Sequence, residues 1–413
     1  MSRLLFVVQR YGREVAGGAE LHCRQFATRM AARGHRVDVL TSCAVNYVDW
    51  ANHYPAGTGE LDGVTVHRLP VAKERDDRLF EPLNTRVVWG ERPVPLYLQQ
   101  EWMRAQGPYI PELPPWLLEH GGDFDVVIFF TYLYYTSWAG LPAASAVAPT
   151  VLHPTAHDEP ALYLDLYRTM FHHPSAFAFS TEEEAALVER RFRHRRPYEI
   201  VGVGVEAERH RGHDGAAFRE AFGLGDTPYL LYVGRVDPAK GSEELLDFFA
   251  AYKSRNPGPL KLAIVGDAVR ALEPHPDVLV TGFVDEALKE SALAGCAALA
   301  LPSYFESFSM ILTEAWAHGR PALVQGHCEV LDGQCRRSGG GIPYRGFAEF
   351  EAAVELVTAD PDLGARMGAA GRRYVEERYA WDAVLDRYER VLALARRAES
   401  SRYSRAPAGT AAR

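Results

Sequence analysis

The segment "ALALPSYFESFSMILTEAWAHG", residues 298–319, changes its hydrophobic period within one short stretch. It opens with a continuous apolar run, which is typical of a buried strand in a parallel sheet. From residue 307 onward the apolar residues follow helical spacing, so Ser307 to Ser309 are expected to form the helix start. A buried strand that leads directly into a helix is the repeating unit of doubly wound α/β folds, and this stretch predicts that class.

The same alternation of strands and helices occurs twice along the chain. One series ends near residue 205 and a second begins near residue 227, which predicts two Rossmann-like domains. The residues between the two series are polar and rich in Gly, His and charge, as in an inter-domain linker. The expected division is 1–205 for the first domain, 206–226 for the linker, 227–380 for the second domain, 381–397 for a C-terminal helix packing back toward the first domain, and 398–413 for a disordered tail.

Composition excludes several classes of protein. The 413 residues carry a formal charge of −9, whereas nucleic-acid binders usually show a basic balance. The five cysteines lack metal-ligand spacing and are expected to be reduced thiols. The apolar run at the N-terminus meets a charge at Arg10 and is too short for a signal peptide or a membrane span, so a cytoplasmic protein is expected.

Residues 44–120 interrupt the alternation with many aromatic residues and prolines. Inserted in the first domain, this segment is a natural place for substrate-specific loops. A packing extension without a binding role is the alternative.

Three short segments carry groups that suit a nucleotide. Glu306 and Glu314 flank the start of the predicted helix, whose free N–H groups suit a diphosphate, and Glu314 lies about 7.5 Å along the axis from Ser309. Arg235 and Lys240 lie on the turn of "YVGRVDPAKGSEELL", where two cations can neutralise a diphosphate. In "VAGGAELH", Gly17 and Gly18 let the backbone approach a phosphate.

The order and spacing of these segments resemble family 4 of the retaining nucleotide-sugar glycosyltransferases, which have the GT-B fold of two Rossmann-like domains and a cleft. The resemblance rests on "GGAE", "VGRVDPAKG", "VGD", "TGFV" and "ESFSMILTEAW" and spans nearly the whole chain apart from residues 44–120. It implies that Glu306 lies at the donor sugar and Glu314 at the ribose hydroxyls. The donor-binding set implied is Gly17, Gly18, Arg235, Lys240, Gly266, Phe283, Ser307, Phe308, Ser309, Met310 and Glu314.

The resemblance also implies a catalytic histidine after a late strand of the first domain. "PTVLHPTAHDEP" offers His153 and His157, and His157, which precedes Asp158, matches the family better. His157, Arg235, Lys240 and Glu306 are therefore the expected catalytic residues. The family usually has Gly at the position of Ser309, and a side chain there would crowd or hydrogen-bond the sugar.

The reaction implied is transfer of a hexose from a nucleoside diphosphate sugar to a hydroxyl of a glycan, glycolipid or small molecule. A UDP-sugar is favoured and a GDP-sugar is the alternative donor. The leaving phosphate takes the acceptor proton, so no enzyme nucleophile is required. No metal is expected, because Arg235, Lys240, the helix start at Ser307 and the glycine loop at Gly17 already supply positive charge and hydrogen-bond donors. No covalently bound cofactor is expected. An epimerase, a phosphorylase and a non-catalytic sugar-nucleotide-binding protein are the rivals, and the oligomeric state stays open.

Two further clusters have plainer explanations. Asp123 and Asp125 have the spacing of a metal-binding pair but lead into a strand, which predicts a polar turn. The arginines between Arg190 and Arg196 are expected at a helix end, where the dipole and solvent favour them. Peripheral contact of this region with the inner face of a membrane is the sharper alternative.

Overall fold

The computed structural model describes residues 1–413 except 16, 207–209, 211, 238–239, 268–272 and 405–413. The chain divides into two compact units. The first contains residues 1–201 and 385–413, and the second contains residues 202–384. Each has its own parallel sheet, as the two-domain prediction requires.

The first unit is built on an eight-stranded sheet of order β3-β4-β2-β1-β5-β6-β7-β8. All neighbouring strands are parallel except β3 and β4, which form an antiparallel hairpin. The central strand β1 reads "RLLFV" and is buried almost throughout, because helices cover both faces of a parallel sheet. The strands are β1 Arg3–Val7, β2 Arg36–Ser42, β3 Gly57–Leu61, β4 Val64–Leu69, β5 Val126–Phe130, β6 Thr150–His153, β7 Ala176–Phe179 and β8 Tyr198–Ile200.

The segment of the first unit that interrupts the alternation of strands and helices also has regular secondary structure. Residues 44–120, which show little periodicity, form the β3–β4 hairpin, three α-helices and the short π-helix Thr85–Trp89 rather than loops alone. Asp62 and Gly63 make the hairpin turn with positive φ values of 53° and 77°, the geometry for which a D-G pair is suited. The main helices of this unit are α1 Gly18–Ala32, α2 Asp77–Asn84, α3 Leu96–Gln106, α4 Leu113–His120, α5 Tyr135–Ala144 and α7 Glu182–Phe192.

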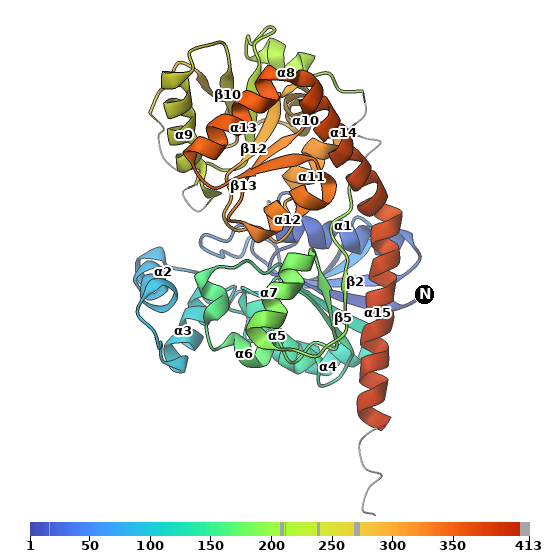
Figure 1. The fold of residues 1–413 in the computed structure, drawn as a ribbon. Helices are drawn as coiled ribbons and strands as arrows, with labels where there is room; N and C mark the ends of the chain where they lie inside the picture. Colours follow the sequence, from blue (N-terminus) through green and yellow to red (C-terminus); the bar gives the residue numbers. More distant parts are fainter. Residues whose placement is uncertain (16, 207–209, 211, 238–239, 268–272, 405–413) are drawn as a thin grey trace, which may run out of the picture. The chain divides into compact units, whose positions relative to one another are not determined.

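The second unit is built on an all-parallel sheet of order β11-β10-β9-β12-β13-β14. Helices α9 and α13 pack together on one side, and α10, α11 and α14 group on the other (Figure 1). The strands are β9 Tyr229–Val233, β10 Lys261–Val265, β11 Val278–Val280, β12 Ala298–Leu301, β13 Ala322–Gln325 and β14 Gly341–Tyr344. The helices are α8 Ala216–Ala221, α9 Ser242–Arg255, α10 Glu286–Gly295, α11 Met310–Ala317, α12 Glu329–Ser338, α13 Phe347–Ala359 and α14 Pro361–Arg378.

The segment expected as a linker belongs to the second unit. Its helix α8 packs against α10, and the Phe218 amide donates to Ser291 Oγ at 3.0 Å. A Cβ at Gly215 would collide with Gly295, so the two backbones touch at this point. These contacts give residues 215–221 of the expected linker a packing role in the second unit, in addition to any connecting role.

The last helix, α15 Trp381–Ser404, joins the first unit from Leu385 onward. Tyr388 packs on Phe26 of α1 with ring centroids 4.5 Å apart. Arg33 and His35 reach Asp386 and Glu389 at 2.7 and 2.6 Å. The helix continues past residue 398, where the tail was expected to begin, and residues 405–413 lie outside the described residues.

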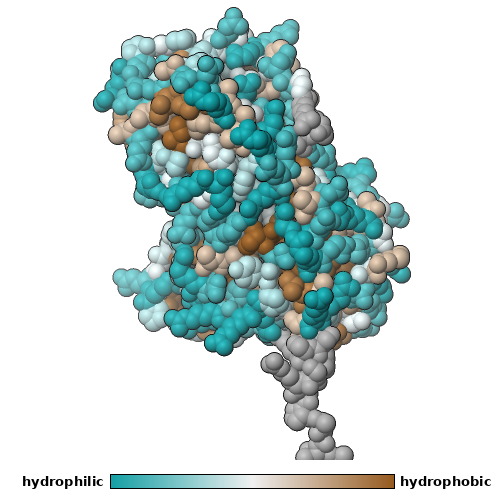
Figure 2. All heavy atoms as spheres, turned by 45° about the vertical axis from the view of Figure 1, so that its right-hand side comes forward, coloured by the Kyte–Doolittle hydropathy of each residue, from teal (hydrophilic) through white to brown (hydrophobic). Residues whose placement is uncertain are grey.

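The surface in view in Figure 2 is mainly hydrophilic, with small hydrophobic patches. Among the described residues, no helix combines the length and the apolar composition that crossing a membrane requires.

Candidate functional site

The predicted donor residues of the second unit lie on turns that follow parallel strands. The β9–α9 turn and the β12–α11 turn touch, because a Cβ at Gly241 would collide with the carbonyl oxygen of Pro302. Gly241 also has a φ of +69°, which favours glycine. The close approach brings Lys240 Nζ to 3.2 Å from Glu306 Oε1. Two residues predicted separately from the sequence therefore form one ion pair at the carboxyl edge of the sheet, where α/β folds bind ligands.

The second predicted cation, Arg235, follows the same strand. Its guanidinium lies 2.6 Å from Asp237 Oδ2, and about half of the Arg235 side chain is exposed. The backbone of this turn is held by Ser242, whose hydroxyl accepts from the Asp237 amide at 2.9 Å. Sequence reasoning did not single out Asp237, although it lies between the two cations. Its carboxylate reduces the net positive charge of the turn in the absence of a ligand.

The helix after β12 begins later than expected. Helix α11 starts at Met310, and Ser309 precedes it as the N-cap with φ 72° and ψ 88°. Ser307 and Phe308 lie before the helix and are almost fully buried. Ser309 is also buried, and its hydroxyl has no hydrogen-bond partner among the described residues. Positive φ explains why glycine suits this position, and it makes Ser309 a strained residue at the helix N-terminus.

Glu314 lies within α11 and pairs with Lys289 of α10, with Nζ and Oε2 3.0 Å apart. Burial raises the pKa of Glu314, while the nearby ammonium of Lys289 opposes that rise. Lys289 also contacts Glu286 at 3.1 Å. The sequence analysis did not identify Lys289 as the partner of Glu314, because the two residues are 25 positions apart and Lys289 belongs to no motif used.

Gly266 and Phe283 complete the predicted set in the second unit. Gly266 follows β10 and forms an isolated bridge with Gly282, its amide donating to the Gly282 carbonyl at 2.9 Å. Phe283 comes next in the chain and is 83% exposed. An exposed aromatic ring beside a glycine bridge offers a flat apolar face, which suits stacking against a base.

In the first unit, Gly17 and Gly18 lie between β1 and α1 as predicted. Gly17 is the N-cap with φ 153°, and a Cβ there would collide with the carboxylate of Glu20. Glu20 is buried and paired with Arg10, whose Nε lies 2.8 Å from Oε1. This buried pair supports the glycine loop from beneath, and sequence reasoning did not identify it.

The structure separates the two candidate histidines. His153 ends β6, is 1% exposed and stacks on Phe130 with ring centroids 4.5 Å apart. Burial lowers the pKa of His153 well below its usual range. His157 lies in the following loop with its side chain 30% exposed and Nδ1 3.7 Å from Glu159 Oε1. His157 is therefore the accessible member of the pair.

The loop that carries His157 is anchored by a buried carboxylate. Glu184 accepts from the amides of Ala156 and Ser180 at 2.7 and 2.6 Å. Burial raises the pKa of Glu184 to about 7, against the effect of these amide hydrogen bonds. The arrangement fixes the backbone next to His157 and gives Glu184 a positioning role.

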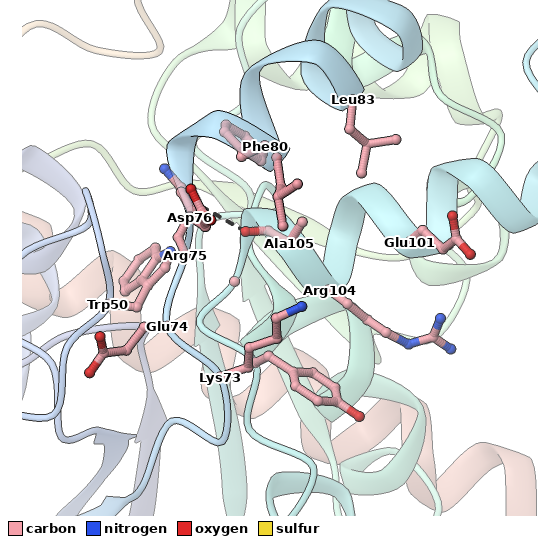
Figure 3. A pocket seen from close by; sticks show the side chains of 13 residues that line it. Trp50, Lys73, Glu74, Arg75, Asp76, Phe80, Leu83, Glu101, Arg104 and Ala105 are labelled. Atoms are coloured by element: carbon pink, nitrogen blue, oxygen red, sulfur yellow. Dashed lines mark hydrogen bonds between the residues drawn. The ribbon is translucent and has the colours of Figure 1, made fainter.

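A pocket of about 350 Å³ lies within residues 44–120 of the first unit (Figure 3). Phe80, Leu83 and Trp50 form an apolar part, and Lys73 and Arg104 extend along another side. The remaining lining residues are Glu74, Arg75, Asp76, Leu79, Glu101, Ala105, Gly107 and Tyr109. Trp50 follows β2 and Lys73 follows β4, so the pocket lies at the same edge of the sheet as Gly17 and His157.

The two other charged clusters have structural contacts. Asp123 and Asp125 precede β5, and the Arg3 amide donates to Asp125 Oδ2 at 2.7 Å, which confirms the polar turn. Arg191 and Arg196 donate to the carbonyls of Tyr163 and His172. Membrane contact through the region from Arg190 to Arg196 gains no support from these contacts.

Comparison with known proteins identifies the class. Residues 17–204 match the family described as "Glycosyl transferase 4-like domain", and residues 227–360 match "Glycosyl transferases group 1". Together with the two parallel-sheet units, these matches show a nucleotide-sugar glycosyltransferase of the GT-B fold. The chain belongs to glycosyltransferase family 4.

Individual relatives agree with this assignment. The D-inositol 3-phosphate glycosyltransferase of Saccharomonospora viridis is 25% identical, over 94% of this chain and 92% of that protein. The structure of sucrose-phosphate synthase from Thermosynechococcus elongatus has a TM-score of 0.68 at 17% identity and covers 97% of this chain and 100% of its own. Anabaena HepE in complex with UDP-glucose has a TM-score of 0.64 at 14% identity, covering 98% and 100%. The epimerase and phosphorylase alternatives are not favoured by these matches.

Proposed function

We propose that this glycosyltransferase moves a hexose from a UDP-sugar to an acceptor hydroxyl with retention of configuration and without a metal in the donor site. The observation that carries the proposal is the contact of Lys240 with Glu306, because it places a cation for the diphosphate beside a carboxylate for the sugar. The choice of UDP is supported by HepE, whose structure contains UDP-glucose.

In this proposal Arg235 and Lys240 neutralise the leaving diphosphate. Each loses a carboxylate contact when the ligand binds, and the diphosphate oxygens replace it with stronger charge-assisted hydrogen bonds. The amides at the start of α11, from Ser307 to Met310, supply further donors. These groups act on charge that grows as the glycosidic bond breaks, so they stabilise the transition state more than the bound donor.

The remaining groups orient the substrates. Glu314 accepts hydrogen bonds from the ribose hydroxyls, Phe283 stacks on the base, and the Gly17–Gly18 loop binds phosphate through its backbone. His157 contacts the donor sugar or the acceptor from its anchored loop. The leaving β-phosphate takes the acceptor proton on the same face of the sugar, so this mechanism assigns no enzyme nucleophile.

The acceptor is proposed to enter the pocket beside Trp50 and Lys73. Its lining combines apolar side chains with both signs of charge, which suits a molecule that has hydroxyl groups and an apolar face. Lys73 and Arg104 form no ion pair with a described residue, so their charges are available to a ligand, whereas the Arg75 guanidinium already donates to the backbone and side-chain oxygens of Gln106.

The test is a ligand screen followed by product analysis. Thermal unfolding is measured with UDP-glucose, GDP-mannose, ADP-glucose and dTDP-glucose, because a ligand that binds the native state raises the midpoint. The UDP-sugar is expected to give the largest rise, and NMR of the product should show the donor's anomeric configuration. A larger rise with another nucleotide would reject UDP, and an inverted product would reject the retaining mechanism.

A further inference from the structure

Three buried side chains from distant parts of the chain converge in the second unit, one helical turn beyond Glu314 on α11. His210 precedes α8, Glu290 is in the middle of α10, and His318 caps the C-terminus of α11. His210 Nδ1 and His318 Nε2 each lie 2.6 Å from Glu290 Oε2. All three residues are nearly inaccessible to solvent.

The arrangement has the composition of a transition-metal site. Two imidazoles and one carboxylate are a ligand set for Zn²⁺, which binds such atoms at about 2.0–2.2 Å. The three ligand atoms lie within 4.8 Å of one another, and this is the only such group found among the described residues. The ring centroids of His210 and His318 are 4.9 Å apart, and a fourth imidazole, His213, has its centroid 5.7 Å from that of His318.

The carboxylate lacks a full set of partners. Glu290 Oε1 is buried without a hydrogen bond among the described residues, and no described lysine or arginine forms an ion pair with Glu290. Lys289, its neighbour in the helix, points its charge to Glu286 and Glu314 instead. A buried carboxylate costs free energy unless a cation or several donors compensate it. A divalent ion would satisfy both the free oxygen and the charge.

Each imidazole also has a second ring nitrogen for its proton. A metal is coordinated by a deprotonated imidazole nitrogen and by a carboxylate oxygen. The ring nitrogens opposite the contacts, Nε2 of His210 and Nδ1 of His318, have no hydrogen-bond partner among the described residues, so each ring can carry its proton there.

The cluster borders a pocket through His318, although the His318 side chain is only 1% exposed. His318 lines a pocket of about 470 Å³ together with Arg320, Thr358 and Arg372. Residues Pro228, Ala297 and Pro321 of the same pocket come directly before β9, β12 and β13. The pocket therefore lies at the amino edge of the sheet, opposite the carboxyl edge that carries Lys240 and Glu306.

We propose that His210, Glu290 and His318 bind one divalent transition-metal ion, best matched by Zn²⁺, with His213 or water in the fourth position. Each imidazole proton moves to the other nitrogen of its ring, and the two N–H···O contacts become metal–ligand bonds. The ion ties the segment before α8 to α10 and α11, which carry Lys289 and Glu314. Its role is structural, and the proposal does not depend on the reaction assigned to the donor site.

The experiment measures metal binding by the full-length protein, which is purified through a removable tag that contains no histidine. After dialysis against chelator, the protein is titrated with ZnCl₂ or MgCl₂ in a calorimeter, and bound metal is counted by mass spectrometry after gel filtration. The expected result is about one Zn²⁺ per chain and no Mg²⁺. Zn²⁺ at 100-fold its Kd should raise the thermal midpoint by about 5 °C or more.

The variants are His318→Gln and Glu290→Gln, with His275→Asn as the matched control. His275 is a histidine of the same unit whose Nδ1 accepts from the Asp277 amide at 3.1 Å, a bond that asparagine can preserve. The first two variants should lose at least tenfold in Zn²⁺ affinity, and the control should keep it. His213→Ala decides the fourth ligand, because only a coordinating His213 would lower the affinity.

The wild-type protein alone can overturn the proposal, even if a variant fails to fold. If the zinc content stays near zero after exposure to ZnCl₂ and the midpoint of thermal unfolding does not shift, the cluster is held by hydrogen bonds and binds no metal. Zinc bound equally well by His318→Gln and Glu290→Gln would place the ion elsewhere.

Discussion

Lys240 Nζ and Glu306 Oε1 are 3.2 Å apart although 66 positions separate the two residues in the chain. Lys240 is about half exposed, whereas the Glu306 side chain is 15% exposed, so the cation faces solvent and the carboxylate lies beneath it. An incoming diphosphate would compete with Glu306 for the ammonium. In the proposed function, this contact brings the lysine assigned to the leaving group next to the acid assigned to the sugar.

Lys240→Ala and Arg235→Ala are each expected to lower kcat/KM by at least about tenfold, since a tenfold loss corresponds to about 1.4 kcal/mol and a charge-assisted contact provides at least that. Initial rates with the donor found in the ligand screen test this. Lys261→Ala is the matched control, because Lys261 opens β10 at the opposite edge of the sheet. Normal rates in both site variants would remove the diphosphate role from this turn.

Glu314→Gln should weaken binding of the nucleoside diphosphate alone, since ribose hydroxyls contact Glu314 in ground and transition states alike. Calorimetry should show a loss of about tenfold or more, the equivalent of one hydrogen bond to a charged group. Because burial raises the pKa of Glu314, binding should also weaken as the pH falls and the carboxylate takes up a proton. Glu355→Gln on α13 is the control, and equal affinities for both variants would place the ribose elsewhere.

His157→Ala should reduce transfer much more than nucleotide affinity, because His157 is accessible and lies in the anchored loop. His153→Ala should instead destabilise the first unit by about 2–4 kcal/mol, since it leaves a cavity among stacked rings. Thermal unfolding and initial rates separate the two effects. A stable His153→Ala protein with lost activity would reverse the assignment.

Ser309→Gly should raise the thermal midpoint, because a non-glycine residue at φ 72° costs about 1 kcal/mol. Ser309→Ala keeps the backbone strain and removes only the hydroxyl, which makes it the matched control. If the hydroxyl contacts the donor sugar, both variants should lose the same factor in donor affinity. Donor affinity unchanged in both would exclude that contact.

Adding EDTA immediately before the measurement should change the initial rate of transfer by no more than about twofold. A tenfold loss, which corresponds to about 1.4 kcal/mol, would be clearly distinguishable from this. The physical reason is that Arg235, Lys240 and the start of α11 already supply positive charge. Slow loss of thermal stability on long exposure would report on the His210–Glu290–His318 cluster instead. Immediate loss of activity, restored by Mg²⁺ or Mn²⁺, would refute a metal-free donor site.

The amino-acid sequence by itself determined the fold class and most strands of both units, because continuous apolar runs between helical repeats have few other structural solutions. It missed β3, β4 and β14, which are partly exposed strands without a continuous apolar run. The D-G pair at Asp62 and Gly63 was the available signal for the hairpin. The family resemblance implied that Lys240 and Glu306 belong to one donor site, but their direct contact was not predicted and came from the structure.

Only the tertiary structure decided which side chains pair and which are accessible. Lys289 reaches Glu314, and His210 reaches Glu290 and His318, through helix packing that no local pattern encodes. Burial likewise separates His153 from His157, although the two lie four positions apart in one segment. Local sequence specifies backbone conformation and apolar faces, whereas side-chain pairing and solvent access depend on which distant elements the packed core brings together.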